Sequence, residues 1–386
     1  MQTIDKSRLN KHRIIFVTGT RADYGKMKSL IRILVNTKQF DIHIFATGMH
    51  MLSKYGSTYK EIIKDGFPNI YTFVNQNAHT DMDIALSNTI TGFSNYISEL
   101  RPDAIVVHGD RLEALAGAIV GAFRNIRVFH IEGGEVSGTI DESIRHAITK
   151  FSHFHLVANE EAKRRILQLG ELEKNIYIFG SPDIDIMHSQ HLPSIATVKD
   201  YYEIPFTKYN IVLYHPITTE LDLLCEQAEK LVDALLASTG HYVIIYPNND
   251  AGSDLILNEY DRLQEHACFR IFPSMRFEYF LTLLKNADCI IGNSSSGIRE
   301  ACIYGIPAID IGNRQKGRYK LSECPNIIHI DKPDFLQNAL LQAHNLQLSP
   351  VSYFGDGKSD VQFRNILLKD EIWNSNIQKQ FIDINF

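Results

Sequence analysis

The feature that most constrains the fold is a regular alternation of short apolar runs with longer amphipathic segments. The runs end in Gly, Asp, Asn or Pro, and segments between them, such as 26–36 and 111–123, have the length and periodicity of helices. Strands that alternate with helices predict parallel sheets covered by helices on both faces. The runs of the first half are RIIFVTG, DIHIFATG, DAIVVHGD, RVFHIEGG, FHLVANE and IYIFGSP.

The alternation stops once and starts again, which predicts two domains. The stretch FGSPDIDIMHSQHLPS (179–194) is rich in Pro, Ser and Asp and indicates an interdomain linker. We expect an α/β fold of two Rossmann-like doubly wound domains with parallel sheets, 1–185 and 195–362, with an interdomain cleft at the strand ends. Residues 363–386 indicate one or two terminal helices whose packing partner the sequence does not disclose. The runs of the second half are YNIVLYHP, HYVIIYPNND, FRIFPS, DCIIGNSS, PAIDIG and NIIHID.

Composition excludes several classes of protein. Apolar residues make up 44% and charged residues 22% of the chain, as in globular proteins, and the net charge of −6 argues against nucleic acid as the main partner. The five cysteines lack CxxC spacing and indicate reduced thiols. No run approaches the length of a membrane span and no leader-like segment is seen, so we expect a cytoplasmic protein without a membrane partner. No residues have metal-ligand spacing, and we expect neither a metal nor a cofactor.

Two motifs of the second half suit phosphate. In DCIIGNSSSGIRE (288–300) a strand ends before Ser294 and Ser295, whose hydroxyls and helix-end N–H groups can surround a pyrophosphate, while Glu300 can accept from a ribose diol. The alternative is an N-capped helix whose serines serve only the backbone. Arg314 follows the next strand with two further cations, Lys316 and Arg318, for which a solvated basic loop is the alternative.

In the first half, the turn VTGTRADYGKM brings Arg21 and Lys26 to a helix N-terminus, which suits an anion, although a well-capped turn is the alternative. Acidic residues follow two later strands: Asp110 after one, and Glu132 and Asp141 after the other. Such a dense polar set is hard to explain by folding alone.

Three further residues have open or structural interpretations. For Glu142 and Arg145, a surface ion pair at i,i+3 spacing is the favoured interpretation. His215, at the end of IVLYH, can hydrogen-bond a leaving phosphate or act as an acid, and is as readily a buried, satisfied histidine.

Taken together, several motifs resemble one family along the chain from about residue 12 to the C-terminus. They are similar to the hydrolysing UDP-N-acetylglucosamine 2-epimerases of bacterial sialic acid biosynthesis. Ala22-Asp23 stands where non-hydrolysing relatives have Pro-Glu, which favours the hydrolysing branch. The motifs are GTRADYGK, TGMHM, HGDRLEALAG, HIEGGEVSGTIDESIRHA, GSPDIDIM, YPNND, FPSMRFEYF and GNSSSGIREA.

The resemblance implies that UDP-N-acetylglucosamine and water give N-acetylmannosamine and UDP, by elimination to a 2-acetamidoglucal and hydration with inversion at C2. It implies a GT-B-like fold and a homo-oligomer, dimer or tetramer. Which carboxylate removes the C2 proton stays open. The implied catalytic residues are Asp110, Glu132, Asp141 and His215, and the implied substrate-binding residues are Arg21, Lys26, Arg111, Phe277, Ser294, Ser295, Glu300 and Arg314.

Three alternatives remain. The nearest is the same reaction on UDP-2,4-diacetamido-2,4,6-trideoxyglucose, the sugar of legionaminic acid synthesis, because its enzymes share GTRADY, HIEGGE and YPNND. A glycosyltransferase of GT-B fold would need an acceptor before it turned over. A nucleotide-sugar binding protein without turnover is the third, although several carboxylates at the sugar would weaken its hold on an anionic ligand.

Overall fold

The computed structural model describes residues 11–137, 140–189, 192–319, 321, 324–346, 348–350 and 354–383. The chain forms two compact units. The first unit comprises residues 1–135, 143–185 and 355–386, and the second comprises 136–142 and 186–354. The boundary at 185 lies in the expected linker. The division differs from the expected one in two places, because 136–142 groups with the second unit and the chain from Gly355 returns to the first.

The first unit is built on a seven-stranded sheet in which every neighbouring pair is parallel, in the order β3-β2-β1-β4-β5-β6-β7. Each apolar run of the first half forms one of these strands. β3 was not predicted, because it is a three-residue edge strand with an exposed Tyr71 and Thr72 and no apolar run. The strands are β1 (His12–Thr18), β2 (Phe40–Ala46), β3 (Ile70–Thr72), β4 (Ala104–His108), β5 (Arg127–Ile131), β6 (Phe154–Val157) and β7 (Ile176–Ile178).

The second unit has a six-stranded sheet, again parallel throughout, in the order β10-β9-β8-β11-β12-β13. The order reverses between β8 and β11, as it does between β1 and β4 in the first unit, which is the doubly wound arrangement. The expected fold of two Rossmann-like parallel-sheet domains is therefore confirmed. The strands are β8 (Asn210–Leu213), β9 (Tyr242–Ile245), β10 (Phe269–Phe272), β11 (Cys289–Gly292), β12 (Ala308–Ile311) and β13 (Ile327–Ile330).

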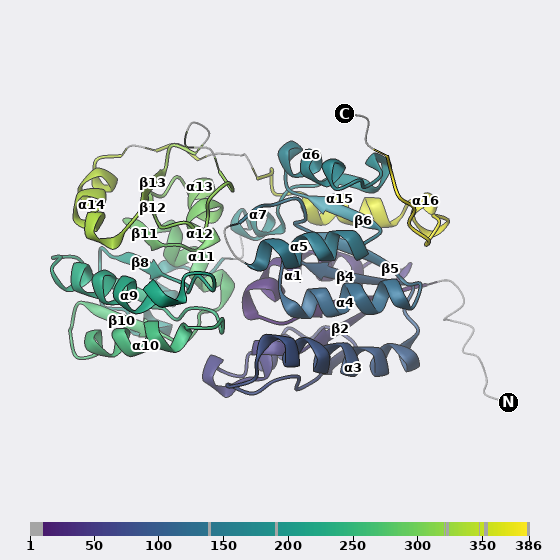
Figure 1. Ribbon diagram of the computed structural model, residues 1–386, viewed down its shortest axis with the longest axis horizontal. Coiled ribbons are helices and arrows are strands. Elements are labelled where there is room, and N and C mark those ends of the chain that lie inside the picture. Colours follow the sequence, from purple (N-terminus) through teal and green to yellow (C-terminus); the bar gives the residue numbers. More distant parts are fainter. Residues whose placement is uncertain are drawn as a thin grey trace. The chain divides into compact units, whose positions relative to one another are not determined.

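Helices cover both faces of the first sheet, as Figure 1 shows. Ile14 and Phe16 of β1 are buried in one apolar cluster together with residues of α1, whereas Ile15 and Val17 are buried in another with residues of α3 and α4. Alternate side chains of a strand point to opposite faces, so continuous apolar runs are what such a sheet requires. The helices up to the linker are α1 (Arg21–Val35), η2 (Gly48–Met51), η3 (Ser53–Tyr55), α2 (Tyr59–Lys64), α3 (Met82–Leu100), α4 (Leu112–Phe123), α5 (Ile140–Phe151), α6 (Glu160–Gln168), η4 (Glu173–Asn175) and α7 (Pro182–Met187).

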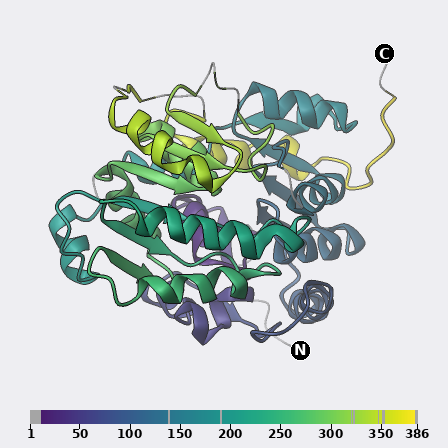
Figure 2. The same cartoon turned by 60° about the vertical axis from the view of Figure 1, so that its left-hand side comes forward.

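In the second unit the helices α9, α10 and α14 lie over one face of the sheet, which is turned toward the viewer in Figure 2. Leu231 of α9 and Leu336 of α14 are fully buried there against Ile291 and Ile309 of the sheet. The helices of this part are α8 (Ile195–Tyr201), α9 (Leu221–Leu236), α10 (Ser253–Tyr260), η5 (Asp261–Leu263), α11 (Phe277–Lys285), α12 (Ser295–Ile298), α13 (Glu300–Tyr304), η6 (Pro333–Phe335) and α14 (Leu336–His344).

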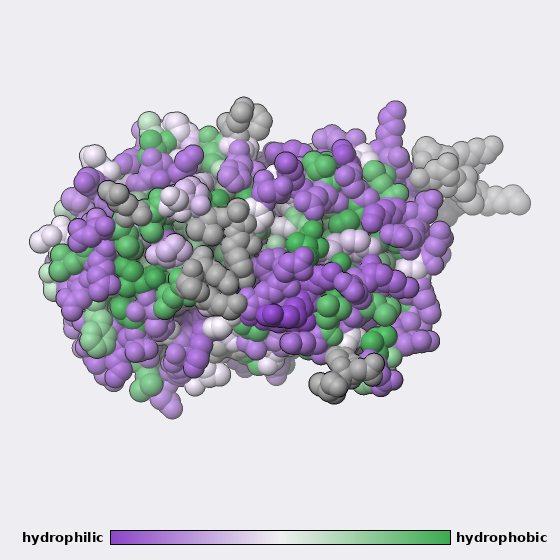
Figure 3. Space-filling view, turned by 90° about the horizontal axis from the view of Figure 1, so that it is seen from above, coloured by the Kyte–Doolittle hydropathy of each residue, from purple (hydrophilic) through white to green (hydrophobic). Residues whose placement is uncertain are grey.

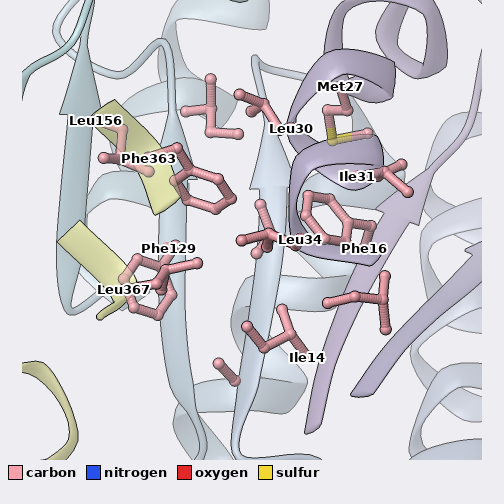
Figure 4. Close-up of a cluster of buried hydrophobic side chains, with 14 of the residues drawn as sticks. Ile14, Phe16, Met27, Leu30, Ile31, Leu34, Phe129, Leu156, Phe363 and Leu367 are labelled. Carbon is pink, nitrogen blue, oxygen red and sulfur yellow. The ribbon is translucent and has the colours of Figure 1, made fainter. Parts of the chain in front are cut away.

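The C-terminal helices α15 (Ser359–Leu367) and α16 (Asp370–Trp373) belong to the first unit, which supplies the packing partner that the sequence left open. Phe363 and Leu367 of α15 point into the cluster that contains Phe129 and Leu156 of the sheet (Figure 4). Trp373 stacks on His12 at the start of β1, with ring centroids 3.7 Å apart. The last helices therefore complete a core that β1 begins.

On the face shown in Figure 3, hydrophobic residues are scattered among hydrophilic ones. Among the described residues, no helix combines the length and apolar character that crossing a bilayer requires.

Candidate active site

The turn after β1 is stabilised by its own acidic residue. Asp23 accepts the N–H groups of Gly19 at 2.9 Å and Thr20 at 3.1 Å, while the Thr20 hydroxyl accepts the N–H of Asp23 and so caps α1. The N–H groups of Gly19 and Thr20 are therefore already bonded to Asp23 and are not available to an anion. For these two groups, the well-capped turn is the correct interpretation.

The two cations of that turn have acidic partners. Arg21 donates to Glu61 at 2.7 Å, and the Lys26 ammonium lies 2.7 Å from a carboxylate oxygen of the buried Asp183. Asp183 belongs to the GSPD motif, so a polar contact joins two motifs that lie far apart in the sequence.

Asp110, two residues beyond the end of β4, forms an ion pair with Arg145 of α5. The Arg145 side chain is 1% exposed and also donates to the Glu135 carbonyl oxygen at 3.0 Å. The expectation that Arg145 lies in a surface ion pair is therefore wrong, because its side chain is buried. Arg145 is a buried partner of Asp110, and Glu142 instead accepts the N–H of Ser137 at 2.6 Å.

Glu132 directly follows β5, the neighbour of β4 in the sheet. Its carboxylate accepts a hydrogen bond from the buried Ser181 hydroxyl, and its other oxygen lies 3.1 Å from Nε2 of His108. Glu132 has a φ of 63°, a left-handed backbone conformation that costs a non-glycine residue on the order of 1–2 kcal/mol. Such local strain is typical of functional positions.

Asp141 lies in the short segment that groups with the second unit. One of its carboxylate oxygens is 3.4 Å from a terminal nitrogen of Arg314, and both side chains are largely buried. The sequence assigned Asp141 to the acidic set of the first domain. In the structure its ion pair joins it to a cation of the expected phosphate site.

In the second unit, His215 is held by two asparagines. Its N–H donates to Oδ1 of Asn293 at 2.7 Å, and the Asn293 amide donates back to the His215 carbonyl oxygen at 2.8 Å. The Asn248 N–H donates to Nδ1 of the ring at 3.0 Å. Because Nδ1 is an acceptor, a neutral His215 carries its proton on Nε2 and can donate it.

The glycine and serines after β11 form a tight turn. Gly292 has a φ of 138°, and a Cβ atom there would stand 2.1 Å from the Leu213 carbonyl oxygen, so no other residue fits. The Ser294 hydroxyl accepts the N–H of Ser296 at 3.3 Å and caps α12, while Ser295 and Ser296 are half-buried. One serine thus serves the cap, as the alternative interpretation required, and Ser295 is not needed for it.

Three further residues expected to bind the substrate belong to the second unit. Arg314, after β12, donates to the Asn293 carbonyl oxygen at 3.2 Å. Glu300 begins α13, is 1% exposed and lies 3.5 Å from the Ser296 hydroxyl oxygen. Phe277 is buried at the first position of α11. Arg318, one of the two cations that follow Arg314 in the sequence, donates to the Val136 carbonyl oxygen at 2.8 Å.

Two histidines of the first unit, His130 and His153, have a pKa far below the ordinary value of a histidine. Burial lowers the pKa of His130 to about 3, and its ring contacts the Gly109 carbonyl oxygen at 2.8 Å and the Thr149 hydroxyl at 3.1 Å. Burial also lowers the pKa of His153 to about 4. Within the described part of the chain, no group of three or more His, Cys, Asp or Glu side chains is arranged to hold a metal ion.

Sequence reasoning missed the residues that hold the acids in place. Asp110 and Glu132 follow adjacent strands, as predicted, but Arg145, His108 and Ser181 around them were not assigned to the site. The spacing of Arg145 from Asp110 is 35 residues, which no local pattern can detect. The only signal available was that each of these residues lies inside a motif already singled out.

Two relatives match almost the whole length of the chain. A relative from Neisseria meningitidis named UDP-N-acetylglucosamine 2-epimerase is 47% identical over 97% of this chain and 99% of its own. One from Legionella pneumophila, named UDP-N,N'-diacetylbacillosamine 2-epimerase (hydrolyzing), is 36% identical over 92% and 95%.

The crystal structure of the Methanocaldococcus jannaschii UDP-GlcNAc 2-epimerase in complex with UDP-GlcNAc and UDP matches with a TM-score of 0.77. It is 23% identical and covers 92% of this chain and 99% of its own, which shows a shared fold. The family model described as UDP-N-acetylglucosamine 2-epimerase matches residues 32–368. The chain therefore belongs to the UDP-N-acetylglucosamine 2-epimerase family.

Proposed function

We propose that this protein is a hydrolysing UDP-N-acetylglucosamine 2-epimerase, which converts UDP-N-acetylglucosamine and water to N-acetylmannosamine and UDP. The observation that carries the proposal is the pair of carboxylates after adjacent strands, Asp110 ion-paired with the buried Arg145 and Glu132 beside Ser181 and His108. Two acidic groups so firmly held suit proton transfers at a sugar carbon. The names of the Neisseria and Legionella relatives support the same class of reaction.

In this proposal the second unit binds the UDP moiety. Ser294, Ser295 and Arg314 contact the diphosphate, and the Nε2–H of His215 donates to it. Glu300 accepts from the ribose hydroxyls, because a carboxylate offers two acceptor oxygens to a diol. Phe277 lies at the uracil. Arg21, Lys26 and Arg111 contribute further positive charge to substrate binding.

Departure of UDP comes first, because the C2 proton is not acidic while C1 keeps its oxygen. The bond from C1 to the diphosphate oxygen breaks and the electron pair leaves with UDP, whose growing charge the cations stabilise. A carboxylate then takes the C2 proton, and the electrons of the C2–H bond form the C1=C2 double bond of a 2-acetamidoglucal. Tight phosphate binding is thus part of catalysis.

Hydration completes the reaction. A carboxylate takes one proton from water, whose hydroxyl group bonds to C1. A protonated acid delivers a proton to C2 from the face opposite the one that lost it, which gives the manno configuration. Asp110, Glu132 and Asp141 share these transfers. Asp110→Asn, Glu132→Gln and Asp141→Asn each lower turnover, and a folded variant with near-normal turnover would remove that residue from the set.

Proton NMR of the reaction in heavy water tests the proposal. We expect free UDP and N-acetylmannosamine without any added acceptor, and deuterium at C2 of the product. Release of sugar with retained protium at C2, or turnover only after an acceptor is added, would contradict it. The latter result would favour a glycosyltransferase.

A comparison of two substrates tests which sugar the enzyme prefers. The Legionella relative is named for UDP-N,N'-diacetylbacillosamine, so that compound and UDP-N-acetylglucosamine are compared in one assay. We expect a higher kcat/KM for UDP-N-acetylglucosamine, in line with the higher identity to the Neisseria relative.

We further propose that the protein works in the cytoplasm as a homo-oligomer, a dimer or tetramer. The described cysteines are all free thiols, which suits a reducing compartment. Light scattering of the purified protein measures the assembly, and a monomeric mass would contradict this part of the proposal.

A further inference from the structure

Glu113, in the first turn of α4, has a buried carboxyl group that the proposed reaction does not use. The side chain is 1% exposed, and among the residues that the structure describes neither carboxyl oxygen has a hydrogen-bond partner of ordinary geometry. The nearest cation is Arg111, whose Nε lies 3.5 Å from Oε2. Burial raises the pKa of Glu113 above its ordinary value, although the charge of Arg111 opposes this.

The carboxyl group is wedged between two glycines of different turns. A Cβ atom at Gly19, after β1, would stand 2.5 Å from Cδ of Glu113, and one at Gly48, after β2, would stand 2.3 Å from Oε1. Both distances are far below an ordinary contact, so Glu113 can reach this position only because both residues are glycines. The GTR and TGM motifs of the sequence therefore meet at one side chain.

Stability alone does not explain an acid at this position. A buried carboxyl group without hydrogen bonds costs free energy, and an apolar side chain of similar volume would pack there at lower cost. Residues that are unfavourable for the fold but present at a site are typical of a functional requirement. Arg111 directly follows Asp110 and precedes α4, so whatever fixes Arg111 also affects the expected catalytic acid.

We propose that Glu113 is a positioning residue, whose carboxyl group, set by Gly19 and Gly48 of the turns after β1 and β2, holds Arg111 in the arrangement that binds the nucleotide sugar. This proposal rests on the proposed function. Glu113 itself is too deeply buried to contact the substrate, so it acts through Arg111.

Glu113→Met separates this role from a structural one. We expect a melting temperature equal to or above that of the wild type, together with a loss of about 10- to 100-fold in kcat/KM, the size of effect expected from a displaced neighbour. The matched control is Glu171→Met, another buried acid, which has ion-pair partners in Lys150 and Lys379. This control should lose stability and keep its turnover per folded molecule. A Glu113→Met enzyme that behaves like the control would overturn the proposal.

Gly19→Ala provides a second test, because the atoms nearest to its added methyl group all belong to Glu113. Gly19 is absent from the left-handed backbone positions, so alanine causes no backbone strain there. We expect Gly19→Ala to lower kcat/KM in the wild type but to add no loss in a Glu113→Ala background. Independent, multiplying losses would show that Gly19 does not act through Glu113.

Coupling to Arg111 provides the third test. If Glu113 acts through Arg111, Glu113→Met should have little effect on kcat/KM once Arg111 is changed to alanine. Losses that multiply in the double variant would overturn the proposal.

The activity of the wild type distinguishes a failure of this proposal from a failure of the proposed function. Turnover of UDP-N-acetylglucosamine by the wild type is therefore measured first. If the wild type binds that compound in calorimetry without converting it, the proposed function fails, and the same variants are compared by their dissociation constants. A wild type that neither binds nor converts it contradicts both proposals.

Discussion

Asn293 and His215 exchange two hydrogen bonds across neighbouring strand ends, one from the His215 N–H to the asparagine oxygen and one from the asparagine amide to the His215 carbonyl oxygen. The backbone carbonyl of Asn293 also accepts from Arg314 and Gln315. One fully buried side chain thereby ties the end of β8 to the turn after β11, and so connects the histidine with the serines.

Asn293→Ala should lower the free energy of unfolding by about 2–3 kcal/mol, because it removes a side-chain hydrogen bond from each of two buried backbone groups of His215. Urea denaturation measures this loss. Asn345→Ala is the matched control, since the exposed Asn345 makes a single side-chain contact to the Leu341 carbonyl oxygen and should change stability by less than about 0.5 kcal/mol. Equal effects of Asn293→Ala and Asn345→Ala would show that the two hydrogen bonds between Asn293 and His215 do not contribute to stability.

His215→Ala should lower kcat more than it lowers UDP affinity. If Nε2–H stabilises the charge that develops on the leaving diphosphate, its removal costs about 100-fold in kcat. UDP affinity, measured by calorimetry, should change far less. His215→Gln, which keeps an N–H donor, should recover part of kcat. Parallel losses in kcat and affinity would indicate simple binding.

Arg145→Met should leave the Asp110 carboxylate without its buried partner. We expect a loss of about 1–3 kcal/mol in stability, because the Asp110 carboxylate, which is 24% exposed, loses a charged hydrogen-bond donor. The turnover of each folded Arg145→Met molecule should also fall. Steady-state assays at low temperature, where the variant stays folded, measure this. Arg164→Met is the control, because Arg164 is 66% exposed and pairs with Glu161 at 3.6 Å on the helix surface. A fully active Arg145→Met enzyme would exclude a role for this arginine in holding Asp110.

Phe363→Ala should destabilise the first unit by about 3–5 kcal/mol, the usual cost of a large cavity in a core. Phe363 is fully buried among residues of β1, α1, β5 and β6. Phe381→Ala removes the same ring from a side chain that is 89% exposed and should be nearly neutral. Chemical denaturation with a probe in the first unit separates the two variants.

Acid should destabilise the fold from about pH 6.5 downward. Burial lowers the pKa of His50 and His153 to about 4 and that of His130 to about 3, against 6.5 for an ordinary histidine. Below pH 6.5 the unfolded chain takes up protons that the folded chain excludes, so stability present above pH 6.5 is lost as the pH falls toward these values. Each histidine contributes about 2 kcal/mol between pH 7 and pH 5.

Replacing one of these histidines should weaken that dependence. His130→Gln should reduce the fall in melting temperature between pH 7 and pH 5, whereas His79→Gln, at an exposed position, should not. Identical pH profiles for the wild type and His130→Gln would contradict the assignment of His130 as a neutral buried residue.

Much of the fold could be predicted because strands covered on both faces leave continuous apolar runs in the sequence. The edge strand β3 leaves no such run, since two of its three residues are exposed. The site acids were predicted from their positions after strands. Their partners were not, because Arg145 meets Asp110, and Ser181 meets Glu132, only through the folded topology. The i,i+3 spacing of Glu142 and Arg145 suggested a local pair, but burial of Arg145 against Asp110 decided otherwise.

The return of the chain to the first unit after Gly355 has a consequence for biosynthesis. The sheet that β1 begins obtains Phe363 and Leu367 only from a segment that follows the second unit in the chain and is translated after it. While the ribosome is still adding the second half, the nascent first half must keep an apolar face uncovered, where chaperones can bind it.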